Sequence, residues 1–302
     1  MFKRKLIPTI MAAVCFLAAI CIMLYPAVSS YVNEKYRSEI HTAYEEVIEQ
    51  ADNAELLQVK ELAIAYNQSI IPGTTMENAY SQVALLAASE NYDAQLNITG
   101  DGLMGYVEVP KINVNLPIYH GTDSETLNRG VGHLLGSSLP VGGQSTHSIL
   151  TGHSGMASQR LFTDLEQLEM GDVFYVHVLG ETLAYQVDSI NTVLPYDTSL
   201  LGISQGEDFC TLVTCTPVTV NTHRLLVRGV RIPYEKAQEV QEEIAITEEP
   251  QASNWEEQYI LGICLGIFAV LTIALISIFV VQYRRKHPRT KKRKGGRYAK
   301  KA

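Results

Sequence analysis

A cysteine and an arginine lie at the facing ends of two short apolar segments. Cys215 ends the segment 209–215, and Arg224 begins the segment 224–232 nine residues later. The thiolate is the reactive form of cysteine, and nearby positive charge favours it. Cys215 is therefore a candidate nucleophile. The alternative is an ordinary buried cysteine and a surface arginine that closes a strand.

The connection between these segments is short enough for an antiparallel hairpin. In such a pair the end of the first strand lies beside the start of the second, so Cys215 and Arg224 become neighbours across the ladder. The guanidinium of Arg224 then has fixed donors to offer to an oxyanion. We expect these two side chains to share one site.

Acyl transfer by cysteine also needs a proton donor for the leaving group, usually a histidine. Several histidines lie outside the apolar segments at the two ends of the chain. His153 is the best placed, because it follows the apolar run 148–151 and lies between Gly152 and Gly155, in a loop free to present a side chain. We find no metal-ligand spacing, and this chemistry needs no metal or other cofactor.

The residues around this constellation form short β-rich runs separated by turn residues. Many such runs within about 130 residues predict a closed or sandwiched β domain. The expected strands are 105–109, 114–119, 147–151, 173–179, 182–193, 209–215 and 224–232, and one short helix is expected over 161–168.

Helical periodicity precedes and follows the β-rich region. Residues 33–70 predict a long amphipathic helix that Pro72 and Gly73 stop, and Thr74 with Glu77 fits a capping box that opens a second helix. Residues 235–257 are acidic and helical in pattern, which predicts a stalk.

Two uncharged apolar segments, 6–28 and 260–281, are long enough to cross a bilayer, which takes about 20 residues. Lysines and arginines flank their outer sides, so we expect both termini in the cytoplasm and the middle of the chain outside the cell. The first segment could instead be a cleaved signal peptide.

The formal charge is unevenly distributed. All 32 acidic residues lie between the two apolar segments, whereas 14 of the 24 basic residues lie at the two ends, so the external part carries a formal charge of −22. Nucleic acid is therefore not an expected partner of the external part. The basic C-terminal tail suits the positive-inside topology and anionic lipid headgroups.

Several longer motifs resemble the sortase family. Residues 211–215 (TLVTC), with Arg224 nine residues on, resemble the sortase signature, and residues 151–155 (TGHSG) resemble its histidine loop. Class C, the pilus-assembling sortases, is the most similar class. The stretches that carry this likeness are 105–112, 116–122, 133–143, 161–165 and 221–229.

The resemblance implies an eight-stranded β-barrel, mainly β in class, with its active site at one end. It implies that Cys215 attacks the threonine carbonyl of an LPxTG-like sorting signal and forms a thioester, which a lysine amine of a pilin resolves. His153 matches the general acid/base and Arg224 the residue that stabilises substrate and oxyanion, while Thr214 is expected to help position substrate. The implied partners are pilin or surface proteins at the membrane of a Gram-positive cell.

The expected domain organisation follows from these segments. It consists of a transmembrane anchor or signal (1–29), a helical N-terminal region (30–102), a catalytic sortase barrel (103–234), an acidic stalk (235–258), a C-terminal transmembrane helix (259–283) and a basic cytoplasmic tail (284–302).

Two departures from the class C pattern affect regulation and specificity. Residues 50–102 contain no Asp-Pro pair, which in this class anchors a lid, and residues 217–220 (PVTV) stand where the class commonly has Tyr-Gly. Three other functions remain open at this point: a sortase that attaches proteins to a cell-wall precursor, a plain cysteine protease, and a non-catalytic exported β domain such as an adhesin or sensor.

Overall fold

The structure is a computed structural model that describes residues 3–70, 91–156, 159–247 and 262–267, together with positions 270, 272 and 283. Of these, the side chains of residues 3–13 and 244–247 are not described. The chain divides into two compact units, Met1–Ala252 and Ser253–Ala302, and all that follows concerns the first.

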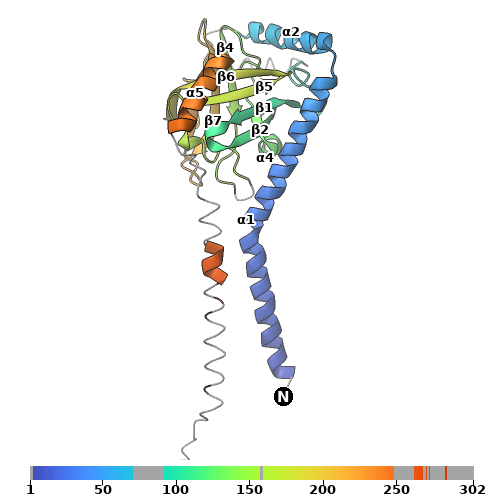
Figure 1. Cartoon of the computed structure of the whole chain (residues 1–302), viewed down its shortest axis with the longest axis vertical. Coiled ribbons are helices and arrows are strands. Elements are labelled where there is room, and N and C mark those ends of the chain that lie inside the picture. The colour runs from blue at the N-terminus through green and yellow to red at the C-terminus, as the bar shows by residue number, and fades with distance from the viewer. Residues whose placement is uncertain are drawn as a thin grey trace, which may run out of the picture. The chain divides into compact units, whose positions relative to one another are not determined.

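Eight strands close into a barrel in the order β1-β2-β3-β4-β7-β8-β6-β5 (Figure 1). Their bounds are β1 Leu103–Val109, β2 Val114–His120, β3 Val131–His133, β4 Thr146–Thr151, β5 Val173–Val178, β6 Glu181–Val193, β7 Asp208–Thr216 and β8 His223–Ile232. The expected closed eight-stranded, mainly β fold is confirmed. Two pairs, β2 with β3 and β4 with β7, are parallel, and the others are antiparallel.

The barrel interior is filled by alternate residues of the strands, as the period of two requires. Cys210 and Leu212 of β7 and Leu225 and Val227 of β8 belong to the main buried cluster. The residues between them on the outer face, Val213 and Leu226, pack in a separate small cluster with Ile149 and Leu201. β7 and β8 are therefore covered on both faces.

The seven strands expected from the sequence each lie within two residues of an observed strand. The sequence pattern missed β3, which has only three residues, and helix α4 Ser124–Arg129, which has six. The expected helix over 161–168 is instead a turn followed by the short 3-10 helix η2 Leu165–Gln167. Leu161 has φ +44, a left-handed conformation from which a right-handed helix cannot begin.

The expected single helix over 33–70 is two helices, α1 Lys3–Gln50 and α2 Asn53–Ser69. Asp52 lies at the break and accepts a hydrogen bond from the backbone N–H of Ala54 at 3.2 Å, so it caps α2. Part of the first helix, Val14–Gln50, is long and apolar enough to cross a membrane by length and composition.

Two buried side chains attach these helices to the barrel. The Tyr44 hydroxyl donates to the Met104 carbonyl of β1 at 3.2 Å and accepts from the Leu179 N–H at the β5–β6 turn at 2.9 Å. The Asn67 amide of α2 pairs with both backbone groups of Leu139, at 2.7 and 3.1 Å. Buried polar groups of this kind are costly to leave unpaired, so the two contacts fix where the helices dock.

Two further expectations fall on residues outside the described part of the chain. The capping box at Thr74 and Glu77 lies wholly within the undescribed stretch 71–90. The second expected span, 260–281, is described only at 262–267, 270 and 272. The helix expected within 235–257 appears as α5 Tyr234–Thr247, and its Ala237 packs against the barrel in a cluster with Val173 and Ile232.

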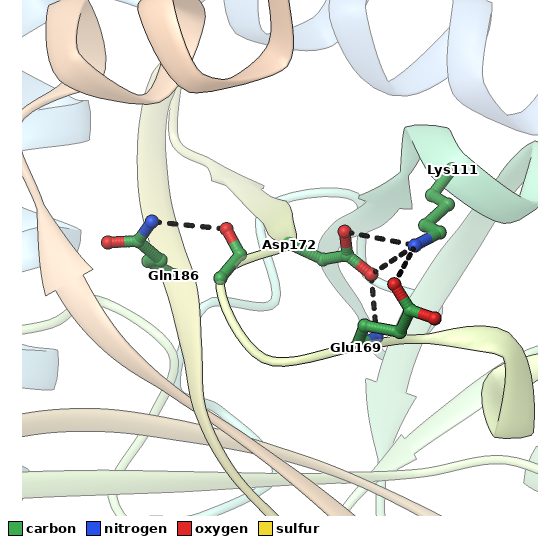
Figure 2. A network of polar contacts seen from close by, with 5 residues as sticks. Lys111, Glu169, Asp172 and Gln186 are labelled. Carbon is green, nitrogen blue, oxygen red and sulfur yellow. Dashed lines mark hydrogen bonds and ion pairs between the residues drawn. The ribbon is translucent and has the colours of Figure 1, made fainter. Parts of the chain in front are cut away.

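A polar network fastens the loop before β5 to the connection between β1 and β2 (Figure 2). Lys111, in the 3-10 helix η1 Pro110–Ile112, contacts the Glu169 carboxylate at 3.2 Å and that of Asp172 at 3.1 Å. Asp172 is buried and also accepts the Glu169 backbone N–H at 2.7 Å. Because the Asp172 carboxylate is paired with a cation and a backbone donor, its burial is tolerated.

Candidate active site

Cys215 lies on the outer face of β7, near the end of the strand. Side chains alternate along a strand, so Cys215 shares the face of Val213, whereas Cys210 and Leu212 face the barrel interior. Cys215 is half-buried, whereas Cys210 is fully buried. Burial raises the pKa of the Cys210 thiol well above its usual range. Of the two thiols in the barrel, Cys215 alone is reachable by a substrate.

Arg224 lies directly opposite Cys215 on the neighbouring strand. β7 and β8 form the antiparallel hairpin expected from the sequence, and Cys215 is the register partner of Arg224. On its other side Arg224 pairs with Val193 of β6. Its guanidinium donates to the backbone carbonyl of His223 at 3.0 Å. The expected proximity of this thiol and this arginine is therefore confirmed.

His153 approaches the same thiol from the opposite neighbour of β7. β4 and β7 pair in parallel through Thr151 and Val213, and the Gly152 N–H continues the ladder to the Val213 carbonyl at 3.0 Å. The strand ends at Thr151, and the following loop, which carries His153, contacts β7 again at Ser154, whose hydroxyl binds the Cys215 carbonyl. β4 and β8 are therefore the two neighbours of β7, with His153 in the loop that follows β4 and Arg224 in β8, and His153 is half-buried like the thiol.

Thr214 lies under the histidine loop. It is buried, and its hydroxyl donates to the Gly152 carbonyl at 2.8 Å. Ser154 on the other side of His153 is also buried, and its hydroxyl donates to the Cys215 carbonyl at 2.6 Å. The sequence placed Ser154 within a family-like motif, but nothing in its residue type predicted that it binds the nucleophile's own backbone.

Two glycines allow the histidine loop to pack closely. A side-chain carbon on Gly152 would lie 2.6 Å from the Phe162 ring, and one on Gly155, whose φ is +70, would lie 2.9 Å from Val218. Gly152 therefore permits the loop to contact the ring, and Gly155 permits it to contact the β7–β8 connection. This packing places Val218, in the segment that departs from the class C pattern, beside the histidine loop.

An apolar cluster adjoins the thiol. The small outer cluster consists of Ile149, Leu201, Val213 and Leu226. Two partly buried side chains, Leu134 and Val193, pack against it. The β6–β7 connection adds exposed apolar side chains, among them Tyr196 at 94% exposure. The four residues of the cluster are buried, so they cover the outer face of the barrel and do not themselves offer a surface to a peptide.

Two other histidines of the barrel are structural. His133 donates from Nε2 to the Ser138 carbonyl at 2.9 Å, and its Nδ1 accepts from the Tyr92 hydroxyl at 2.8 Å. His147 donates from Nδ1 to the Gly202 carbonyl at 2.9 Å, and its Nε2 pairs with the Thr211 hydroxyl at 2.7 Å. Burial lowers the pKa of each to about 4. Both rings are therefore neutral and fully engaged, so neither is a candidate acid/base for Cys215.

These lowered pKa values predict a loss of stability in acid. Unfolded histidine titrates near 6.5, so between pH 6.5 and 4 the unfolded chain binds protons that the folded barrel does not. Stability is thus complete above about 6.5 and falls as the pH drops toward 4, by about 3 kcal/mol for each buried ring. Urea unfolding of His147→Gln at pH 7.5 and 5.0 should show a smaller pH effect than wild type. An equal effect in the two proteins would contradict the assignment.

Within the described residues, no three or more histidine, cysteine or acidic side chains are grouped so that they could hold a metal ion. The groups that are present are the reachable thiol of Cys215 in β7, the guanidinium of Arg224 in β8 and the imidazole of His153 in the loop after β4. A thiol and an imidazole in this relation support nucleophilic attack with general acid/base assistance. A guanidinium there can stabilise an oxyanion.

Comparison with known protein families gives a match to the Sortase domain over residues 107–232. Sortase D of Bacillus subtilis is 32% identical over 131 residues, which are 42% of this chain and 63% of that protein. Sortase A of Streptococcus agalactiae is 26% identical over 153 residues, which are 50% of this chain and 61% of that protein. The matches thus span about three fifths of the length of these curated relatives.

Solved structures give broader matches. Sortase C of Streptococcus pneumoniae is 42% identical, with a TM-score of 0.58, over 65% of this chain and 97% of that one. Sortase C1 of Streptococcus agalactiae is 44% identical, with a TM-score of 0.57, over 65% of this chain and 98% of that one. Nearly the whole of each solved chain therefore has a counterpart here.

Proposed function

The chain belongs to the sortase family, whose members are cysteine transpeptidases, and from this premise we propose that it is a membrane-anchored class C enzyme that polymerises pilin subunits. The observation that supports the proposal is the pairing of β7 with β4 and β8: Arg224 is the register partner of the half-buried Cys215, and the loop that carries His153 follows β4 and binds the Cys215 carbonyl through Ser154. In this proposal the catalytic residues are His153, Cys215 and Arg224.

In the first step the Cys215 sulfur attacks the threonine carbonyl of an LPxTG-like sorting signal. A carbon–sulfur bond forms, and the amide bond to the following residue breaks. His153 takes the proton of the Cys215 thiol and gives it to the departing amine, and Arg224 turns from its backbone partner to the developing oxyanion. The product is a thioester on Cys215 and a released C-terminal peptide.

In the second step the side-chain amine of a pilin lysine attacks the thioester. A carbon–nitrogen bond forms, the carbon–sulfur bond breaks, and His153 takes the proton that the amine loses. The pilins are then joined by an isopeptide bond, and the Cys215 thiol is regenerated. The energy of the cleaved peptide bond is conserved in the thioester, so no cofactor is required.

The relatives and the first helix support a proposal for the partner and the location. The Streptococcus pneumoniae enzyme is discussed for its pilin substrate specificity, and another similar structure is sortase C1 of a pilus island. For this chain we propose a pilin substrate, an N-terminal anchor in α1, a second span over 260–281 and a catalytic barrel outside the cell, with both termini in the cytoplasm.

Detergent-solubilised full-length enzyme should be mixed with a sorting-signal peptide and then with a lysine-bearing pilin domain. We expect an acyl-enzyme on Cys215, identified by its added mass, and covalent pilin ladders after the pilin is supplied. A wall-precursor amine should be offered in competition. Preference for that amine would replace pilin polymerisation with wall anchoring, and free acid as the main product despite added amine would identify a protease.

A further inference from the structure

We propose that Ser154 is a positioning residue of this acyl transfer, which holds His153 in place through the backbone carbonyl of Cys215. The proposal rests on the function proposed above. It concerns a side chain that does not itself contact the reacting atoms but binds the main chain of the residue that does.

The contact between Ser154 and Cys215 is short and buried. Ser154 is 9% exposed, and its Oγ lies 2.6 Å from the Cys215 carbonyl oxygen. The hydroxyl donates, and the carbonyl accepts. Ser154 follows His153 directly in the sequence. Its hydrogen bond therefore ties the residue next to the proposed acid/base to the backbone of the nucleophile.

This hydroxyl takes the place of a missing backbone donor. In the parallel ladder the Gly152 N–H binds the Val213 carbonyl, so a ladder continued by two residues would bring the N–H of residue 154 to the carbonyl of residue 215. The strand ends at Thr151, and the chain turns away. The Ser154 side chain supplies the donor instead, so the Cys215 carbonyl stays paired while the loop is free to aim His153 at the thiol.

A second tie holds the other side of the same histidine. The Thr214 hydroxyl donates to the Gly152 carbonyl at 2.8 Å, next to the ladder bond from Gly152 to Val213. The residue before His153 is thus bound to residues 213 and 214, and the residue after it to residue 215. His153 is therefore fixed in register with Cys215 from both sides.

This fixation matters because general acid/base catalysis requires hydrogen-bond reach, and a displacement of about 1 Å can cost about 100-fold in rate. A loop that loses one of its two ties should keep its fold but hold His153 less accurately. Binding of the sorting signal should change little, because neither hydroxyl faces the outer surface beside the thiol. The effect should therefore fall on kcat rather than on KM.

The test measures kcat and KM of the full-length enzyme for sorting-signal cleavage, with rates normalised to the amount of acyl-enzyme each preparation can form. Ser154→Ala should lower kcat about tenfold and leave KM within about twofold, while Ser154→Thr, which keeps the hydroxyl, should recover most of the rate. The matched control is Ser69→Ala at the end of α2, because the Ser69 hydroxyl also donates to a backbone carbonyl at 2.6 Å. Its kcat should equal that of wild type.

Thr214→Val supplies a second, nearly isosteric probe. If Thr214 acts on the histidine loop, kcat falls and KM is retained, and the double variant with Ser154→Ala is less impaired than the product of the two single effects. If Thr214 instead contacts substrate, KM rises.

The proposal would be overturned if Ser154→Ala had the kcat of wild type, or if Ser154→Thr lost as much kcat as Ser154→Ala. In either case, turnover by the wild type would still support the sortase function. Absence of a Cys215 acyl-enzyme in the wild type would overturn the proposed function itself.

Discussion

Replacing Cys215 with alanine is expected to abolish sorting-signal cleavage and pilin joining, with a loss of at least about 1,000-fold in kcat. The reason is that Cys215 is the proposed acyl carrier, and removal of a covalent nucleophile leaves only the weak contribution of binding and electrostatics. Ladder formation on gels and the mass of the trapped acyl-enzyme measure this loss directly.

Cys210 provides the matched control on the same strand. It lies five residues before Cys215 but faces the barrel interior and is completely buried. Cys210→Ala should cost about 1 kcal/mol in the free energy of unfolding and leave kcat within about twofold of wild type. Brief alkylation of the native wild type should modify Cys215 and spare Cys210. Full activity in Cys215→Ala would show that the nucleophile lies elsewhere.

The second large effect concerns the closure of the barrel. Gly105 lies in β1, where β1 pairs with β5, and a side-chain carbon there would lie 2.1 Å from the backbone oxygen of His177. Both strands are held by neighbours on their other sides, so neither backbone can retreat. Gly105→Ala should therefore lower the free energy of unfolding by about 4 kcal/mol or more, as measured by urea or thermal unfolding.

Gly100→Ala is the control for Gly105→Ala, because it adds the same side-chain carbon at a glycine where that carbon meets no other atom. Gly100 has φ +78, but its added carbon would meet nothing within 4 Å. We expect this control to cost only about 1 kcal/mol, the price of placing a non-glycine residue in the left-handed region. Equal stability losses in the two variants would refute a clash at Gly105.

The sequence predicted the local geometry of the site better than its long-range geometry. The hairpin that pairs Cys215 with Arg224 followed from two apolar segments and a short connection, because hairpin register is a local property. The position of His153 depends instead on the parallel pairing of β4 with β7, two strands that are distant in sequence. Residue types alone gave no register for that pair, so His153 was selected from its position in a glycine-flanked loop and from the motif resemblance.

The features that were missed are short or tertiary in origin. β3 has three residues and α4 has six, too few to show a period, although Asp123 caps α4 through the backbone N–H groups of Glu125 and Thr126. The break at Asp52 interrupts an otherwise continuous helical pattern. The ties made by Ser154 and Thr214 depend on where a loop returns to a strand, which no local propensity encodes.

The parallel pairing of β4 and β7 also bears on when the enzyme becomes active. Between the two strands the chain must complete β5, β6 and their connections, so His153 meets Cys215 only after a long segment has folded. Contacts between residues far apart in sequence form late and slowly, because the entropy of closing the loop is lost before the contact is gained. Refolding should thus restore the β7–β8 hairpin before it restores catalysis, and the Cys215 thiol would lack its proposed partner His153 until the barrel closes.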